Sequence, residues 1–140
     1  MRVLGVDPGS VRIGLALSDP LGKIASPLLV LTINSAKDGA RKVASEARKR
    51  EVDLVVVGLP LQLSGEEGYE AQKARSFMAL LERRLPIPVK SFDERLSSKA
   101  AKDALREGGM DSRAQRGRLD SIAAAIMLQS FLDMQIDGRD

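Results

Sequence analysis

The side-chain types in this sequence restrict the chemistry that the chain can perform. Its 140 residues include no Cys, no His and no Trp. Thiol nucleophiles, thiolate zinc sites, Ser-His-Asp triads and imidazole metal ligands are therefore excluded. Carboxylates, Lys, Arg, hydroxyls and backbone amides remain, and carboxylates favour hard cations such as Mg²⁺ or Mn²⁺.

Three acidic positions stand at the ends of segments that are predicted to be regular. Asp7 ends a strand, Asp93 and Glu94 follow another strand, and Asp120 lies near the start of a helix. Consecutive strand residues point to opposite faces, so only one of Asp93 and Glu94 can face the same site as Asp7. Clustered carboxylates repel one another unless cations neutralise them. Two divalent ions roughly 4 Å apart would do so and would activate water for attack on a phosphodiester.

Each acid also has an ordinary structural explanation. Asp7 begins an Asp-Pro-Gly sequence that is typical of a type II turn with Gly9 as its third residue. The acids at 93–94 can pair locally with Arg95, an interaction that is worth little at a surface. An acid such as Asp120 in the first turn of a helix is stabilised by the helix dipole. These interpretations stay open beside the catalytic one.

Hydrophobic periodicity predicts the elements that must position these acids. The predicted strands are 3–6, 12–18, 28–33, 53–58 and 89–92, and the predicted helices are 37–51, 74–85, 97–108 and 119–132. Short connections between the first three strands indicate an antiparallel meander, and the later strand–helix alternation indicates right-handed crossovers. The expected α/β architecture is ribonuclease H-like, with a five-stranded mixed sheet flanked by helices. A flavodoxin-like sheet is less compatible with three consecutive strands that have no helix between them.

The length of the chain is typical of one domain, which we expect to span 1–134, with a frayed tail at 135–140. The first residues do not resemble a signal peptide. No apolar run approaches the roughly 18 residues that are needed to cross a bilayer. We therefore expect a location in the cytoplasm.

Basic residues near the three acids are the candidates for nucleic-acid contacts. The chain has 22 Lys and Arg against 19 Asp and Glu, so their placement is more informative than the net charge of +3. Arg12 and Arg95 flank two of the acids, and Arg113, Arg116 and Arg118 precede the third. Guanidinium groups at these positions would lie where phosphates arrive.

Other polar features have more ordinary interpretations. The basic residues of the helix at 37–51 are typical of a solvated face with pairs such as Glu46 with Arg50. Three of the four aromatic residues are expected in the core, so recognition of backbone or shape is favoured over base stacking. The loop 61–68 is rich in Gly and polar residues and is a candidate flexible rim of the site.

Several short motifs occur along the chain in a fixed order: Gly5-Val6-Asp7-Pro8-Gly9, Arg12-Ile13-Gly14-Leu15-Ala16, Val57-Gly58-Leu59-Pro60-Leu61 with Gly65, Asp93-Glu94-Arg95-Leu96-Ser97, and Asp120 with Ala123, Ala124 and Ile126. Through them nearly the whole chain resembles the YqgF/RuvX family. That resemblance implies a ribonuclease H-like fold. It also implies a role in resolving Holliday junctions, by likeness to RuvC, or in maturing the 5′ end of precursor 16S ribosomal RNA during ribosome biogenesis.

Carried over by position, the resemblance places the catalytic and metal-binding acids at Asp7, Glu94 and Asp120. A RuvC-type resolvase carries a second acid on the last helix, one turn on, where this sequence has Ala123 and Ala124. Asp19 or Asp93 would substitute for it only if the fold brought either of them close.

The leading hypothesis is a hydrolase, a phosphodiester endonuclease that acts on precursor rRNA or branched DNA with Mg²⁺ or Mn²⁺. A homodimer would be required to cut a four-way junction symmetrically. The alternative is a non-catalytic RNA- or ribosome-binding module with the same fold. Nucleotide binding of the actin-like kind is a lower alternative, because it needs two such lobes and 140 residues supply one.

Overall fold

The computed structural model describes residues 1–97 and 113–136, with the backbone alone for 113–117 and 136. The elements are β1 (Val3–Asp7), β2 (Arg12–Ser18), β3 (Ala25–Thr32), α1 (Ala36–Lys49), β4 (Leu54–Leu59), α2 (Tyr69–Glu82), β5 (Val89–Asp93), the short 3₁₀ helix η1 (Glu94–Leu96) and α4 (Arg113–Ile136). The helix that the sequence predicts at 97–108 falls almost entirely outside the described residues. None of the described helices is long and apolar enough to cross a membrane.

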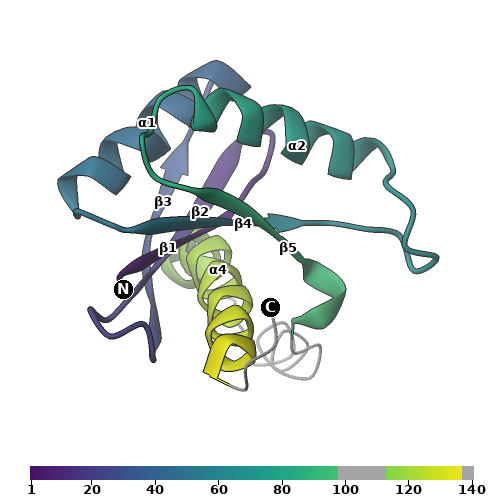
Figure 1. Ribbon diagram of the computed structural model, residues 1–140. Coiled ribbons are helices and arrows are strands. Elements are labelled where there is room, and N and C mark those ends of the chain that lie inside the picture. The colour runs from purple at the N-terminus through teal and green to yellow at the C-terminus, as the bar shows by residue number, and fades with distance from the viewer. Residues whose placement is uncertain (98–112, 137–140) are drawn as a thin grey trace.

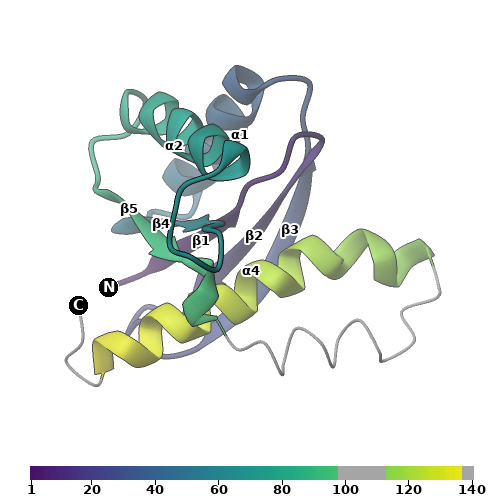
Figure 2. The same ribbon diagram turned by 90° about the vertical axis from the view of Figure 1, so that its right-hand side faces the viewer.

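The strands form one mixed sheet in the order β3-β2-β1-β4-β5. β1, β2 and β3 are antiparallel neighbours, whereas β4 is parallel to both β1 and β5. Helices α1 and α2 cover one face of the sheet and α4 crosses the other (Figures 1 and 2). The predicted ribonuclease H-like arrangement is confirmed, and the antiparallel meander is incompatible with the flavodoxin-like alternative.

Alternation along the strands divides the core into two layers. In β1, Leu4 and Val6 pack beneath α1 and α2, whereas Val3 packs against α4. Gly5 also faces α4, since a Cβ added there would lie 2.9 Å from Cβ of Leu128. The same alternation places Asp7, the last residue of β1, on the α4 face.

Helix α4 begins at Arg113 rather than near Leu119, and it continues to Ile136, into the segment that we expected to be a tail. Asp120 therefore lies in the interior of the helix and not in its first turn. The interpretation of Asp120 as a partner of the helix dipole is wrong, because that interaction acts within the first turn.

The segment after β1 also differs from the expected type II turn. Such a turn requires a positive φ at Gly9, but the described glycines with positive φ are Gly22 and Gly65. Glycine is required at this position for a different reason. A Cβ on Gly9 would lie well inside van der Waals contact with the backbone carbonyl of Arg12.

Candidate active site

Asp7 lies between two glycines in one row across the sheet. It pairs with Gly14 of β2, and the parallel register Val6–Val57 continues to bring Gly58 of β4 beside it. All three residues face α4, because the residues that precede them on each strand pack on the opposite face. The neighbours of Asp7 in this row therefore carry no side chain, and other parts of the chain can approach the sheet closely there.

Gly14 allows α4 to pass directly over β2. A Cβ added to Gly14 would lie 2.9 Å from the backbone nitrogen of Ser121 and closer still to the carbonyl of Asp120. No residue with a side chain fits here without moving the helix backbone. Close packing at this glycine therefore brings the backbone of Asp120 to the row that contains Asp7.

Gly58 similarly allows the side chain of Glu94 to lie directly over β4. A Cβ on Gly58 would lie 2.5 Å from Oε1 of Glu94 and 3.2 Å from its Cγ and Cδ. The Glu94 carboxylate thus lies over the glycine next to Asp7, carried there by η1 at the end of β5. We call Asp7, Glu94 and Asp120 the acid row.

Asp93 is held in a separate local structure. Its carboxylate accepts the backbone N–H of Arg95 at 2.9 Å and thereby caps η1. It also accepts Nη2 of Arg95 at 2.6 Å and Nε at 3.0 Å. The hydrogen bond from the Arg95 side chain lowers the pKa of the Asp93 carboxyl. The local ion pair expected at 93–95 is present, and it is formed by Asp93.

Asp19 lies at the opposite end of the sheet from Asp7, just beyond β2. It accepts the backbone N–H groups of Leu21, Lys23 and Ile24 at 3.2, 2.7 and 2.8 Å. These bonds, that from Ile24 most of all, lower its pKa. Asp19 therefore stabilises the turn between β2 and β3 and does not reach the acid row.

Arg12 pairs directly with one member of the acid row. Its Nε donates to Oδ2 of Asp120 at 2.9 Å, with the two side chains 57% and 33% exposed. This ion pair offsets the charge of Asp120 when no other cation is near it. The pair is accessible to solvent, so phosphates or metal ions can compete for either partner.

The donor chemistry of the acid row fits a hard divalent cation, because each member supplies carboxylate oxygens alone. Within residues 1–97 and 113–136, however, no group of three or more acidic side chains is gathered closely enough to hold a metal ion. Asp120 is directed toward Arg12. A shared ion would therefore require the Asp120 carboxylate to exchange its guanidinium partner for the metal.

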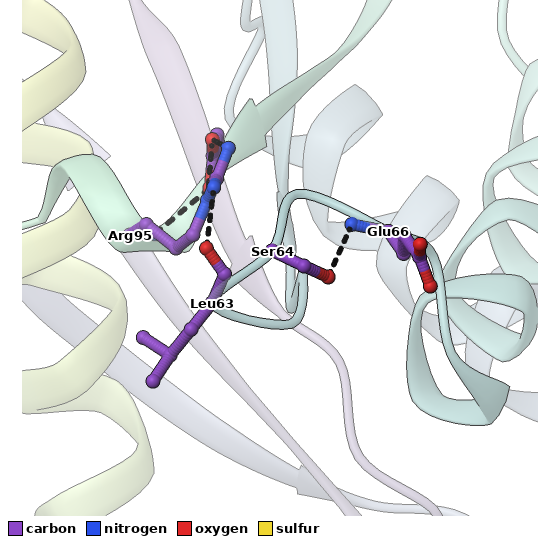
Figure 3. A network of polar contacts seen from close by, with 5 residues as sticks. Leu63, Ser64, Glu66 and Arg95 are labelled. Carbon is purple, nitrogen blue, oxygen red and sulfur yellow. Dashed lines mark hydrogen bonds and ion pairs between the residues drawn. The ribbon is translucent and has the colours of Figure 1, made fainter.

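The loop 61–68 adjoins the segment that carries Glu94. Nη1 of Arg95 donates to the carbonyl of Leu63 at 3.4 Å, and the backbone N–H of Glu66 donates to the Ser64 hydroxyl at 3.3 Å (Figure 3). Gly65 turns the loop with a φ of +89°. The candidate rim is thus positioned beside η1, with the Leu63 side chain exposed to solvent.

The arginines before Asp120 lie on the first turns of α4, which extend past the strands in Figure 2. Arg118 is exposed, while the side chains of Arg113 and Arg116 lie outside the described part of the chain. As predicted, the basic face of α1 is solvated, and Nη2 of Arg50 pairs with Glu46 at 3.2 Å.

Sequence reasoning missed two features that define the site. Gly14 and Gly58 allow the Asp120 backbone and the Glu94 side chain to approach the sheet beside Asp7. The available signal was a small residue in each strand where a larger one is usual. It also missed the side chains of Ser10, Tyr69 and Lys73, which meet beside the loop after β1. The four-residue spacing of Tyr69 and Lys73 on one helix was the available signal for their contact.

Comparisons with known proteins agree with this fold. Residues 1–134 match the family model described as RuvX, Holliday junction resolvase. A candidate pre-16S rRNA nuclease of Anaeromyxobacter sp. strain Fw109-5 is 46% identical over 133 residues, which are 95% of this chain and 97% of the relative. A protein of the same description from Syntrophus aciditrophicus strain SB is 41% identical over 133 residues, 95% of this chain and 89% of the relative.

Two solved structures share the fold at low sequence identity. RuvC of T. thermophilus in complex with a Holliday junction has a TM-score of 0.62 and 18% identity, covering 96% of each chain. Fowlpox virus resolvase in complex with Holliday junction DNA has a TM-score of 0.59 and 15% identity, covering 97% of this chain and 99% of the other. The match along almost the whole sequence, at up to 46% identity to curated relatives, shows that this chain belongs to the RuvX family of nucleases.

Proposed function

We propose that this protein hydrolyses phosphodiester bonds in structured nucleic acid and that the acid row is its catalytic site. The observation that carries the proposal is that the Glu94 carboxylate lies over Gly58 and the backbone of Asp120 lies over Gly14, the two glycines on either side of Asp7. Two positions of the buried sheet, Gly14 and Gly58, carry no side chain, and an acidic residue lies against each of them. Divalent cations would draw these carboxylates together, because acids that no cation neutralises repel one another.

The proposed role of the acid row is to hold Mg²⁺ or Mn²⁺ through carboxylate oxygens. Asp7 is central in the row, and Glu94 and Asp120 would complete the set of carboxylates that holds the ions. Divalent ions bound there would supply an activated water and would stabilise charge on the phosphate. Arg12 would keep Asp120 in place in the absence of metal and would contact a phosphate once Asp120 has exchanged its partner.

The remaining basic residues would bind the backbone of the substrate on either side of the acid row. Arg95 is fixed by Asp93 and by the loop 61–68, so its guanidinium is presented in a defined position near Glu94. Arg113, Arg116 and Arg118 would extend the contact along the first turns of α4. Contacts of this kind give affinity and register without reading sequence.

The proposed substrates are the 5′ end of precursor 16S rRNA, Holliday junctions, or both. The first comes from the description of the curated relatives and the second from that of the family and of the structural neighbours. Phosphate contacts do not distinguish ribose from deoxyribose. A role in ribosome biogenesis would place the protein in the cytoplasm, and symmetric cutting of a junction would require a homodimer.

A side-by-side cleavage assay tests the proposal. Precursor rRNA extended at its 5′ end and four-way junction DNA are incubated with the protein and with Mg²⁺ or Mn²⁺, and an Asp7→Asn variant is the control. We expect metal-dependent cleavage of at least one substrate, with 5′-phosphate and 3′-hydroxyl ends, and its loss in the folded variant. Metal-dependent cleavage that persists in a clean preparation of Asp7→Asn would overturn the assignment.

A non-catalytic RNA- or ribosome-binding module is the second candidate, and one observation favours it. Arg12 already neutralises Asp120, and the described acids do not converge on one metal position. A chain in which Asp7, Glu94 and Asp120 are replaced together by Asn, Gln and Asn distinguishes the candidates. An enzyme loses its cellular role with these substitutions, whereas a binding module keeps it.

A further inference from the structure

A pocket of about 400 Å³ lies on the other side of the sheet from the acid row. It opens between the segment that follows β1 and the first turns of α2, over an apolar floor that includes Pro60, Ala74 and Phe77. Its volume is within the range of pockets that hold small organic groups such as nucleobases. The proposed cleavage site does not use it.

Three polar residues of this pocket contact one another: Ser10 from the segment after β1, and Tyr69 and Lys73 from the first turns of α2. Nζ of Lys73 donates a hydrogen bond to the hydroxyl of Ser10. The same ammonium group lies 5.3 Å from the centre of the Tyr69 ring. Tyr69 is 73% exposed, whereas the other three aromatic residues of the chain are buried. An ammonium, a hydroxyl and an exposed ring therefore meet at the rim of an apolar cavity.

The pocket is adjacent to the acid row along the chain. Asp7 ends β1 on the α4 face, and Pro8, Gly9 and Ser10 follow it directly into the wall of the pocket. Three residues span at most about 10 Å. That reach corresponds to about three stacked nucleotides at 3.4 Å each. A nucleic-acid strand at the acid row can therefore place a neighbouring nucleotide in the pocket.

We propose that this pocket holds an unpaired nucleotide of the nucleic-acid substrate, close to the bond that is cut. Lys73 and Ser10 bind its phosphate, and its base stacks on the exposed ring of Tyr69 above the apolar floor. The inference rests on the proposed function and deepens it, because it makes a single-stranded stretch beside the cleavage point part of the substrate.

The chemistry of the pocket matches this occupant. Stacking on an aromatic ring accepts any base, and a lysine binds phosphate as a point charge. Glu70 and Gln72 also line the pocket, and their side chains carry hydrogen-bonding groups of the kind that contact exposed base edges. Our expectation that base stacking is not favoured holds for the three buried rings, and Tyr69 is the exception.

Binding by an Asp7→Asn protein, measured by fluorescence anisotropy, tests the inference without cleavage. The probes are labelled single-stranded RNA and DNA of eight nucleotides and a duplex of the same sequence. Adding Tyr69→Ala is expected to weaken binding of the single strands roughly 5- to 150-fold, and Tyr69→Phe to recover most of that loss. Lys73→Ala is expected to reduce the slope of log affinity against log salt concentration by about 1, which corresponds to the loss of one phosphate contact.

Lys49→Ala is the matched control for charge, because Lys49 is exposed in the last turn of α1, away from the pocket. It should leave the affinity for single strands unchanged. If the parent protein binds neither RNA nor DNA, the proposed function itself fails. If the parent protein binds the single-stranded RNA or DNA and neither Tyr69→Ala nor Lys73→Ala weakens that binding, the pocket inference alone is overturned. Binding of free nucleoside monophosphates as tightly as the octamers would also overturn it.

Discussion

The most informative single substitution is Gly58→Ala, because it displaces one catalytic candidate and leaves the fold intact. The added Cβ would lie 2.5 Å from Oε1 of Glu94, and ordinary contact begins at 3.4 Å, so the carboxylate must retreat by about 0.9 Å. A misplacement of about 1 Å in a catalytic site costs on the order of 100-fold in rate. We therefore expect kcat/KM for nucleic-acid cleavage to fall by about two orders of magnitude.

The stability of Gly58→Ala should hardly change. The obstructing atoms belong to the end of a flexible side chain, and the φ of Gly58 is not positive. Removing a glycine also lowers the entropy of the unfolded chain, which contributes about 0.4–1 kcal/mol in favour of folding. Thermal unfolding measures this, and single-turnover cleavage measures the rate.

The matched control is Gly39→Ala in α1, where the new Cβ would lie 2.9 Å from the end of the Ile13 side chain on the far face of the sheet. Because this substitution leaves Glu94 in place, the variant should cleave far faster than Gly58→Ala. Full activity in Gly58→Ala would refute the idea that the glycine exists to seat Glu94. Unfolding of Gly58→Ala would show instead that the glycine is needed for packing.

Three further predictions follow from the packing and charges around the acid row and α1. Gly14→Ala must push against the backbone at Asp120, so chemical denaturation should show a loss of roughly 1–3 kcal/mol in the free energy of unfolding; a gain would contradict the observed packing. Arg12→Ala removes the cation that pairs with Asp120. Calorimetry should therefore show Mg²⁺ binding that is tighter by up to about fivefold. Weaker binding would contradict the idea that Arg12 and Mg²⁺ compete for Asp120. The hydrogen bond from Arg41 is the main cause that lowers the pKa of Asp38 from 3.8 to about 2. The stabilisation of the fold by the ionised Asp38 is therefore complete above about pH 4 and is lost as the pH falls toward 2. Asp38→Asn should accordingly unfold at a lower temperature at neutral pH and lose less stability between pH 4 and 2, whereas an unchanged acid profile would show that this carboxylate does not contribute.

The sheet could be predicted from the sequence because its signals are local. Alternation of large and small residues in 12–18 and the continuous apolar run before Gly58 both identify strands. The short connections then restrict the topology to a meander followed by crossovers. The observed strand order agrees with that prediction, and α1 lies within two residues of its predicted bounds. Helix α2 begins at Tyr69, five residues before the predicted start.

The start of α4 and the choice between neighbouring acids could not be predicted in this way. The first turns of α4 contain Gly117 and several arginines but no apolar stripe, so periodicity places the start of the helix too late. Alternation in β5 says nothing about Glu94, because the strand ends at Asp93 and a 3₁₀ helix follows. The start of α4 and the placement of Glu94 depend on packing against Gly14 and Gly58. Residues distant in the sequence make these contacts, so a local sequence pattern does not predict them.

The central claim is that the fold selects Glu94, and not the adjacent Asp93, as the acid that acts with Asp7. Single-turnover cleavage by Glu94→Gln and Asp93→Asn tests it most directly, because the substitutions are at neighbouring residues and each removes one negative charge. Asn can still accept the backbone N–H of Arg95 and cap η1, so Asp93→Asn should keep its rate within about tenfold of the unmodified protein. Glu94→Gln should lose cleavage while remaining folded. An active Glu94→Gln beside an inactive, folded Asp93→Asn would contradict the account.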